Sequence, residues 1–175
     1  ALNIDKYKVS FIPNPVDESL DDMKVYENKN AEYDLFFAMS HGVHRGVLKK
    51  GKFDERENLI NYLIKKNPHL KFNIFGMNNI QPIWGDEFKK NLYNSKIALN
   101  LSQGKSVKYY SSDRIAQLMG NGIATLIDKK TKLNRLFSDD EVVFYNSNKD
   151  LNKKLNIMIN NSNDRYKLAQ KGRFK

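Results

Sequence analysis

The chain contains no cysteine among its 175 residues, which excludes disulfide bonds, cysteine-bound zinc and thiol nucleophiles. It has only three histidines, His41, His44 and His69, and we therefore expect no metal site. The sequence also lacks a GxxxxGKS/T Walker loop and a GxGxxG dinucleotide fingerprint. No G-x-S-x-G elbow is present to support a Ser-His-Asp triad.

Long apolar runs are missing as well. None approaches the roughly 18–20 residues that a membrane-spanning helix needs, and the chain does not open on a signal-peptide pattern. Hydrophobic residues make up 40% of the chain and the mean hydropathy is −0.67, as in soluble globular proteins. The length predicts one main domain, and the lack of cysteine favours the cytoplasm.

Acidic residues are few compared with basic ones, so the formal net charge is +10. A nucleic acid, an anionic membrane surface at which the protein is peripheral, or an anionic small ligand would each explain this charge. A codon bias that favours lysine would explain it without any function. Nucleic acid is the weaker expectation, because the lysines form no stripe and no RNA- or DNA-binding signature is visible.

Apolar stretches and amphipathic helical patterns alternate along the chain. Short apolar runs, typical of strands buried on both faces, occupy residues 33–40, 70–77, 96–102, 123–128 and 141–147. Helical patterns occupy residues 54–67, 86–95, 112–120 and 131–139, and one or two further helices follow residue 149. The alternation predicts an α/β fold, a parallel sheet with helices on both faces, because parallel strands need crossover connections.

The chain begins differently from this alternating part. Residues 8–16 combine an apolar run with two prolines, and residues 17–30 are acidic and polar. They predict a strand followed by a helical or irregular connector. We therefore divide the chain into residues 1–32, the leading strand with its connector, and residues 33–175, a Rossmann-like domain.

The functional site is expected beyond the carboxyl ends of the strands, where helix N-termini bind ligands in such folds. The segment YYSSDRIAQLMGNG, residues 109–122, places hydroxyl groups and an arginine at the start of a helix. Ser111, Ser112 and Arg114 can hydrogen-bond a phosphate there, where free N–H groups and the helix dipole favour an anion. The alternative is that a serine caps the helix while Asp113 complements the dipole.

Two other loops carry candidate residues. The loop HGVHRGVLKKGKFDER, residues 41–56, follows a predicted buried strand, and its Arg45 and Arg56 favour a second anion contact. Its lysines, taken singly, are equally typical of a solvated loop. Trp84, in QPIWGDE, follows the apolar run at 70–77, and it is either a partly buried packing aromatic or a wall for a nucleobase.

These segments, in this order, resemble the C-terminal half of a GT-B glycosyltransferase, in particular the CgeB-like branch of the family-1 glycosyl transferases. The resembling pieces are YDLFFAMS, DERENLINYL, FNIFGM, SKIALNLSQG, YYSSDRIAQLMGNGIATLID and LFSDDEVVFYNSNKDL. FIPNPVD resembles the segment that leads into that half. The resemblance implies a Rossmann-like domain that binds a UDP- or GDP-linked sugar, with no metal and no cofactor besides this substrate.

The resemblance also implies roles for individual residues. The diphosphate would meet Tyr110, Ser111, Ser112 and Arg114, together with Arg45 or Arg56 of the earlier loop. The base and ribose would lie along Gly76, Ile83, Trp84 and Gln117. Gln117 matches the second Glu of the E-x7-E motif and Tyr109 stands at the position of the first Glu, so the sugar contacts depart from the family pattern.

The function that this resemblance implies is transfer of the sugar to an acceptor of unknown class, a glycan, a lipid or a protein. The acceptor site would lie in an N-terminal GT-B domain that these 175 residues do not include, so we expect no turnover by this chain alone. Two alternatives remain. One is a non-catalytic nucleotide-binding scaffold, suggested by the missing acids at Tyr109 and Gln117, and the other is a basic nucleic-acid-binding module.

Overall fold

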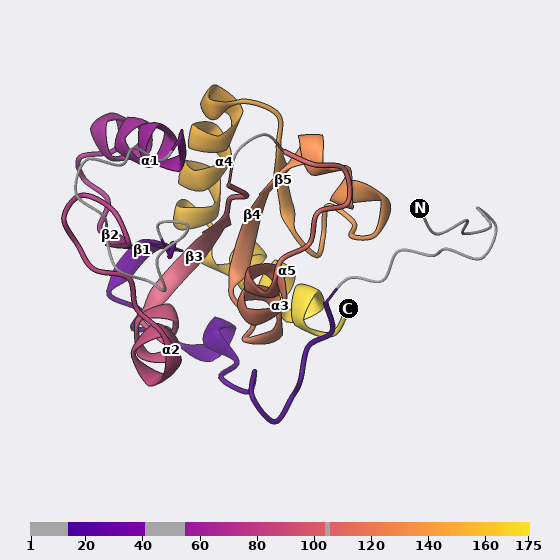
Figure 1. Cartoon of the computed structure of the whole chain (residues 1–175). Helices are drawn as coiled ribbons and strands as arrows, with labels where there is room; N and C mark the ends of the chain where they lie inside the picture. Colours follow the sequence, from indigo (N-terminus) through magenta and orange to yellow (C-terminus); the bar gives the residue numbers. More distant parts are fainter. Residues whose placement is uncertain (1–13, 41–54, 104–105) are drawn as a thin grey trace, which may run out of the picture.

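A computed structural model describes residues 14–40, 55–103 and 106–175 (Figure 1). Its strands are β1 (Tyr33–Ala38), β2 (Phe72–Phe75), β3 (Ser95–Asn100), β4 (Ala124–Asp128) and β5 (Val143–Tyr145). They form one sheet in the order β2-β1-β3-β4-β5, and every neighbouring pair is parallel. The parallel sheet that the alternating pattern predicted is therefore confirmed.

The connections between the strands are mainly helical. The α-helices are α1 (Glu55–Lys66), α2 (Gly85–Tyr93), α3 (Asp113–Gly120), α4 (Asn148–Asn160) and α5 (Ser162–Arg173). Short 3₁₀ turns are η2 (Val25–Glu27), η3 (Lys129–Thr131) and η4 (Leu133–Arg135). The helix predicted over residues 131–139 is wrong, because Lys132 has a φ of 60° and the left-handed residue separates two 3₁₀ turns.

The described part of the predicted leading strand also differs from the expectation. Residues 14–16 have no regular secondary structure, and residues 8–13 lie outside the described part of the chain. The connector at 17–30 is irregular apart from η2, whose backbone is bound to the turn after α3. Val25 N donates to Asn121 O at 2.8 Å and Tyr26 N donates to Gly122 O at 3.0 Å. These bonds fix the connector against the domain.

Side chains from the sheet enter two cores because successive residues of a strand point to opposite faces. Leu35 and Phe37 of β1 pack with residues of α1 and α4, whereas Phe36 packs with residues of α2 and α3. Figure 1 shows these two pairs of helices on opposite sides of the sheet. The continuous apolar sequence of β1 follows from this double coverage, and helices on both faces are confirmed.

The strand order determines where a ligand can bind. From β1 the chain passes to β2 on one side and then returns to β3 on the other side. The connections that leave β1 and β3 therefore diverge, which opens a crevice at the carboxyl ends of these two strands. Ligands of open parallel sheets bind at such a switch point.

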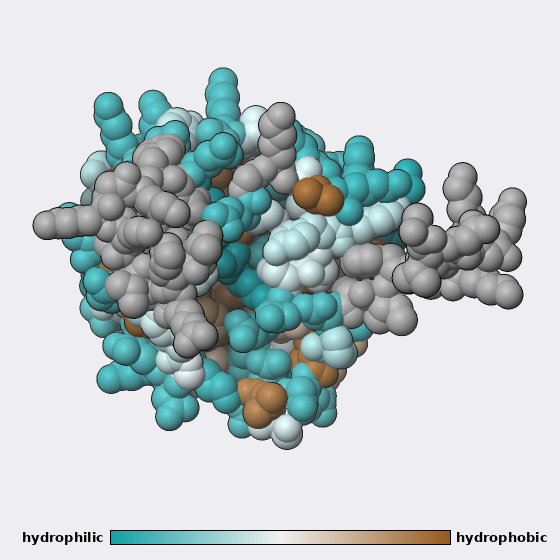
Figure 2. All heavy atoms as spheres, viewed as in Figure 1, coloured by the Kyte–Doolittle hydropathy of each residue, from teal (hydrophilic) through white to brown (hydrophobic). Residues whose placement is uncertain are grey.

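The surface is largely polar, in keeping with the low mean hydropathy. Figure 2 shows one face on which hydrophobic residues form separate spots within a mainly hydrophilic surface. Among the helices that the structure describes, none combines the length and the apolar character required to cross a membrane.

Candidate functional site

A cavity of about 550 Å³ opens at the carboxyl edge of the sheet. We call it the carboxyl-edge cavity. Its walls come from the end of β1, the starts of α2 and α3, and the N-terminal connector. Five residues that the sequence singled out line it, namely Ile83, Trp84, Ser112, Arg114 and Gln117. The fold thus brings the predicted base side and the predicted phosphate side together at the switch point.

The turn before α2 forms the side of the cavity at which the sequence predicts a nucleobase. Trp84 occupies the N-cap position of α2 and remains 55% exposed. Its indole is therefore partly exposed, and it lines the cavity. Ile83, by contrast, is buried and belongs to the core cluster against which Phe88 packs. Its burial anchors the turn that presents the indole.

The start of α3 forms the side of the cavity at which the sequence predicts a phosphate. Ser112 occupies the N-cap position, but its side chain makes no capping hydrogen bond. The Asp113 carboxylate instead accepts a hydrogen bond from the Asn14 side chain. Ser111 Oγ is buried and has no hydrogen-bond partner among the described residues. The Ser112 side chain thus does not cap the helix, whereas Asp113 does stand in its first turn. Ser111 does not line the cavity.

Arg114 is held in a defined position at this edge. Its Nη1 donates a 2.6 Å hydrogen bond to Leu101 O, just beyond β3. Its guanidinium carbon lies 5.9 Å from the centroid of the Phe37 ring of β1. A guanidinium carries five donors in a planar fork, so this anchoring orients a group suited to phosphate.

Gly76 and the end of β1 meet behind the cavity. Gly76 has a φ of 81°, and a Cβ placed on it would lie 1.8 Å from Met39 O. Its own N–H donates to Ile80 O at 3.1 Å. Gly76 does not itself line the cavity, but it permits the close approach that positions Met39 and Ser40, which do. These two lining residues were not among the predicted site residues, although they end the apolar run at 33–40.

Arg56 lies in a different place from Arg114. It is 7% exposed and lines a smaller hollow of about 170 Å³ near the ends of β3, β4 and β5. Tyr145 and Asp128 also line this hollow, and burial followed by the Asp128 charge raises the pKa of the Tyr145 phenol. The structure does not bring Arg56 into the carboxyl-edge cavity, and Arg45 lies outside the described residues.

Of the two residues predicted to match the E-x7-E motif, Gln117 lines the carboxyl-edge cavity and Tyr109 does not. Gln117 is exposed and lines the carboxyl-edge cavity. Tyr109 instead has a φ of 60°, and its hydroxyl accepts a 3.0 Å hydrogen bond from Arg135 Nη1. Lys108 Nζ lies 4.9 Å from the centroid of its ring. Tyr110, which is 46% exposed, does not line the cavity either.

The fold is that of a Rossmann-like α/β domain, and the cavity lies at its switch point. Residues 55–175 match the glycosyl transferase-like family, and the chain belongs to that family. The predicted resemblance to glycosyl transferases is therefore confirmed at the level of the family. No group of three or more metal-ligating side chains occurs within the described residues.

One solved structure is similar to this chain, the C-terminal domain of a glycosyl transferase group 1 family protein (LpcC) from Francisella tularensis. The identity is 18% and the TM-score is 0.46. The similarity covers 69% of this chain and 60% of the length of that one. No curated protein sequence matches the chain.

Proposed function

We propose that the chain is the donor-binding half of a metal-independent glycosyltransferase and that the carboxyl-edge cavity binds a UDP- or GDP-linked sugar. The observation that carries this proposal is the convergence of Trp84, Gln117 and Arg114 on one cavity at the switch point. The start of α3, where Ser112 makes no side-chain cap, adds a place for negative charge.

In this arrangement the nucleobase packs on the exposed indole of Trp84, and the ribose lies beside Gln117. The diphosphate lies at the start of α3, where the helix dipole, the serine hydroxyls and the Arg114 guanidinium favour an anion. A nucleotide bound in this way spans the cavity from the start of α2 to the start of α3. The sugar then lies beyond the diphosphate, where the acids of the family pattern are absent.

The chemical contribution of this half is stabilisation of the leaving group. When the bond between sugar and phosphate breaks, negative charge grows on the nucleoside diphosphate. Prearranged N–H donors and an arginine stabilise that charge more in the transition state than in the bound substrate. We assign no catalytic base to this chain. The acceptor, a glycan, a lipid or a protein, binds to a separate N-terminal domain, in the cytoplasm or at the inner membrane surface.

A thermal-shift and calorimetric panel of UDP, GDP, TDP and ADP tests the proposal. We expect UDP or GDP to raise the melting temperature and Trp84→Ala to weaken binding about tenfold, because stacking on one base contributes about 1–3 kcal/mol. Tyr93→Ala is the matched control, since Tyr93 is an exposed aromatic at the other end of α2. Stabilisation by none of the four nucleotides, or equal losses in both variants, would overturn the proposal.

Arg114 needs a separate pair of variants because it also holds the end of β3. We expect Arg114→Ala to abolish detectable nucleotide binding and to lower the melting temperature. Arg114→Lys keeps one charge and one donor but loses the fork, so we expect intermediate binding. A nucleotide affinity that is the same in all three proteins would remove Arg114 from the site.

A second function, a non-catalytic nucleotide-binding scaffold, is favoured by the orientation of Tyr109. The residue at the first acid position is a phenol bound to Arg135, not a carboxylate facing the cavity. The test uses the longer protein that contains both halves. Binding of a nucleotide sugar without its hydrolysis or transfer would select the scaffold, whereas any turnover would select the enzyme.

A further inference from the structure

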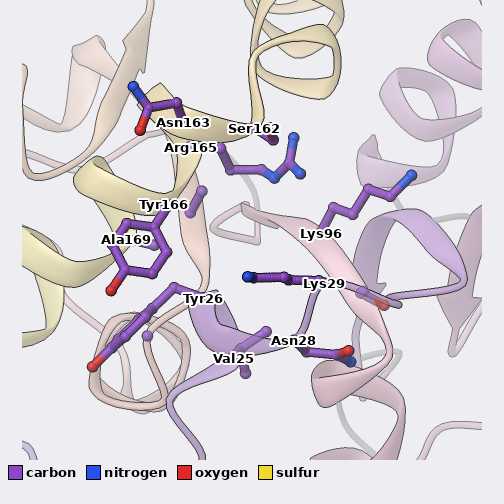
Figure 3. Close-up of a pocket in the computed structure, with 13 residues that line it drawn as sticks. Val25, Tyr26, Asn28, Lys29, Lys96, Ser162, Asn163, Arg165, Tyr166 and Ala169 are labelled. Carbon is purple, nitrogen blue, oxygen red and sulfur yellow. The ribbon is translucent and has the colours of Figure 1, made fainter.

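A second hollow lies at the amino-terminal edge of the sheet, opposite the carboxyl-edge cavity (Figure 3). Its volume is about 410 Å³, and its walls come from η2 and the loop after it, the starts of β3 and β4, and the first turns of α5. We call it the amino-edge hollow. A six-residue strand such as β3 spans about 20 Å, so the sheet separates the two sites.

The charged side chains among the described lining of the amino-edge hollow are all basic. Lys29, Lys96 and Arg165 line it, and no Asp or Glu occurs among the described residues of the lining. Lys96 is neutralised by Asp34, whose Oδ1 lies 2.8 Å from Lys96 Nζ. Lys29 is exposed and forms no ion pair or hydrogen bond with any residue that the structure describes. Lys29 and Arg165 thus form no salt bridge with a described carboxylate, although the Asp34 charge also acts on Arg165.

Arg165 is fixed in orientation by helix α4. Its Nη1 donates to Met158 O at 2.7 Å and to Ile159 O at 3.1 Å. Within the described part of the chain, its remaining N–H groups donate no hydrogen bond. Burial lowers the pKa of this guanidinium by desolvating the cation, and the Asp34 charge opposes that shift. A bound anion would compensate for that lost hydration.

One wall of the hollow is aromatic. The rings of Tyr26 and Tyr166 meet edge to face, with centroids 5.3 Å apart and planes at 87°. Figure 3 shows the two tyrosines together on one side, with Arg165 and Lys29 beside them. Two contrasting surfaces therefore adjoin each other, one for an anion and one for a planar or apolar group.

We propose that the amino-edge hollow binds a soluble, phosphorylated small molecule that carries an aromatic or apolar group. The phosphate lies between Lys29 and Arg165, and the apolar group packs on the Tyr26 and Tyr166 rings. A phosphate suits donors that converge from separate elements, here the loop after η2 and α5, because it offers acceptor oxygens in several directions. The volume is within the range of small-molecule sites. This site is separate from the proposed donor site and does not depend on it.

Phenyl phosphate is a suitable probe because it combines the two features and contains no base or ribose. It is titrated into the whole chain under low salt, with amide resonances followed by NMR, alongside inorganic phosphate and phenol. We expect shifts at Tyr26, Lys29 and the first turn of α5, and weaker binding of both comparison compounds. Lys29→Glu should weaken phenyl phosphate binding about tenfold or more, the effect of one charge-assisted hydrogen bond.

Lys153→Glu is the matched control, because Lys153 is an exposed lysine of α4 that does not line the hollow. Equal weakening by both charge reversals would show unspecific attraction to the basic surface and would overturn the proposal. So would shifts confined to the carboxyl-edge cavity, or no saturable shift. The proposal of a soluble ligand would also fail if the chain bound only to phosphatidylglycerol vesicles and lost that binding in Lys29→Glu.

Discussion

The two hollows at opposite edges of the sheet differ in the charged residues that line them. Two acids and two bases line the carboxyl-edge cavity among the described residues, namely Asp21, Lys89, Asp113 and Arg114. The amino-edge hollow has three bases and no acid in its described lining. The carboxyl-edge cavity combines a helix start, an oriented arginine and a partly exposed indole, whereas the amino-edge hollow combines basic side chains with two tyrosines.

Backbone geometry should matter more at the carboxyl edge, and this gives the largest expected effect. Gly76→Ala would place a Cβ 1.8 Å from Met39 O at a φ of 81°, and neither backbone can move freely. We expect a loss of about 3 kcal/mol or more in the free energy of unfolding, measured by urea titration. At the amino edge, Gly122 has a φ of 72°, and the Cβ of Gly122→Ala would lie 2.6 Å from the Tyr26 ring and 3.5 Å from Lys24 Cα. Because the close contact is with a side chain, we expect a smaller loss of about 2 kcal/mol. The reverse order would contradict the comparison.

Removing a polar side chain at each edge should give a smaller difference in the free energy of unfolding. Asp34 is 8% exposed, and its carboxylate accepts hydrogen bonds from Lys96 Nζ at 2.8 Å and Lys71 N at 2.9 Å. We expect Asp34→Ala to cost about 2 kcal/mol in the free energy of unfolding, against about 1 kcal/mol for Arg114→Ala, which removes the hydrogen bond to Leu101 O and the contact with the Phe37 ring. Asp34→Ala also frees Lys96, so phenyl phosphate binding to the folded variant should become tighter.

The ligand preferences of the two edges can be separated in one experiment. We expect Trp84→Ala to weaken nucleoside diphosphate binding about tenfold and to leave phenyl phosphate binding unchanged. Lys29→Glu should do the opposite, because the sheet separates it from the carboxyl-edge cavity. Calorimetric titration of both ligands into both variants measures this. If each variant weakened both ligands, the two hollows would not act as independent sites.

A difference in pH dependence is the smallest expected effect. Burial raises the pKa of Tyr145 near the carboxyl edge and, less strongly, that of Tyr26 at the amino edge. A raised phenol pKa stabilises the fold fully below the unfolded value of about 10, and this contribution is lost as the pH rises. Tyr145→Phe should therefore flatten the fall in stability between pH 9 and pH 11 more than Tyr26→Phe does. Urea titrations at several pH values give the comparison.

Much of the fold followed from the sequence. Continuous apolar runs predicted all five strands, since a strand that is covered on both faces needs no polar side. The inward residues of α3, Ile115, Leu118 and Met119, also followed from their spacing and are buried. The pattern over residues 131–139 failed, because nothing local shows that Lys132 adopts a left-handed conformation.

The candidate site was predictable only in part. Ser112 and Arg114 were found because local sequence marks the start of a helix after a strand. Arg56 was grouped with Arg114, yet the two residues line different hollows. Helical periodicity indicates which residues of α1 are buried, but not which face of the sheet the helix covers.

The sequence by itself determined the alternation of strands and helices, the helix start at Ser112 and the membership of a glycosyl transferase-like family, because these depend on local order and spacing. The tertiary structure decided the strand order, the separation of Arg56 from Arg114, and the existence of the amino-edge hollow. That hollow joins Lys29, Lys96 and Arg165, which lie far apart in the chain and meet only when the strand ends and α5 pack together. Long-range packing creates such contacts, and no local pattern encodes them.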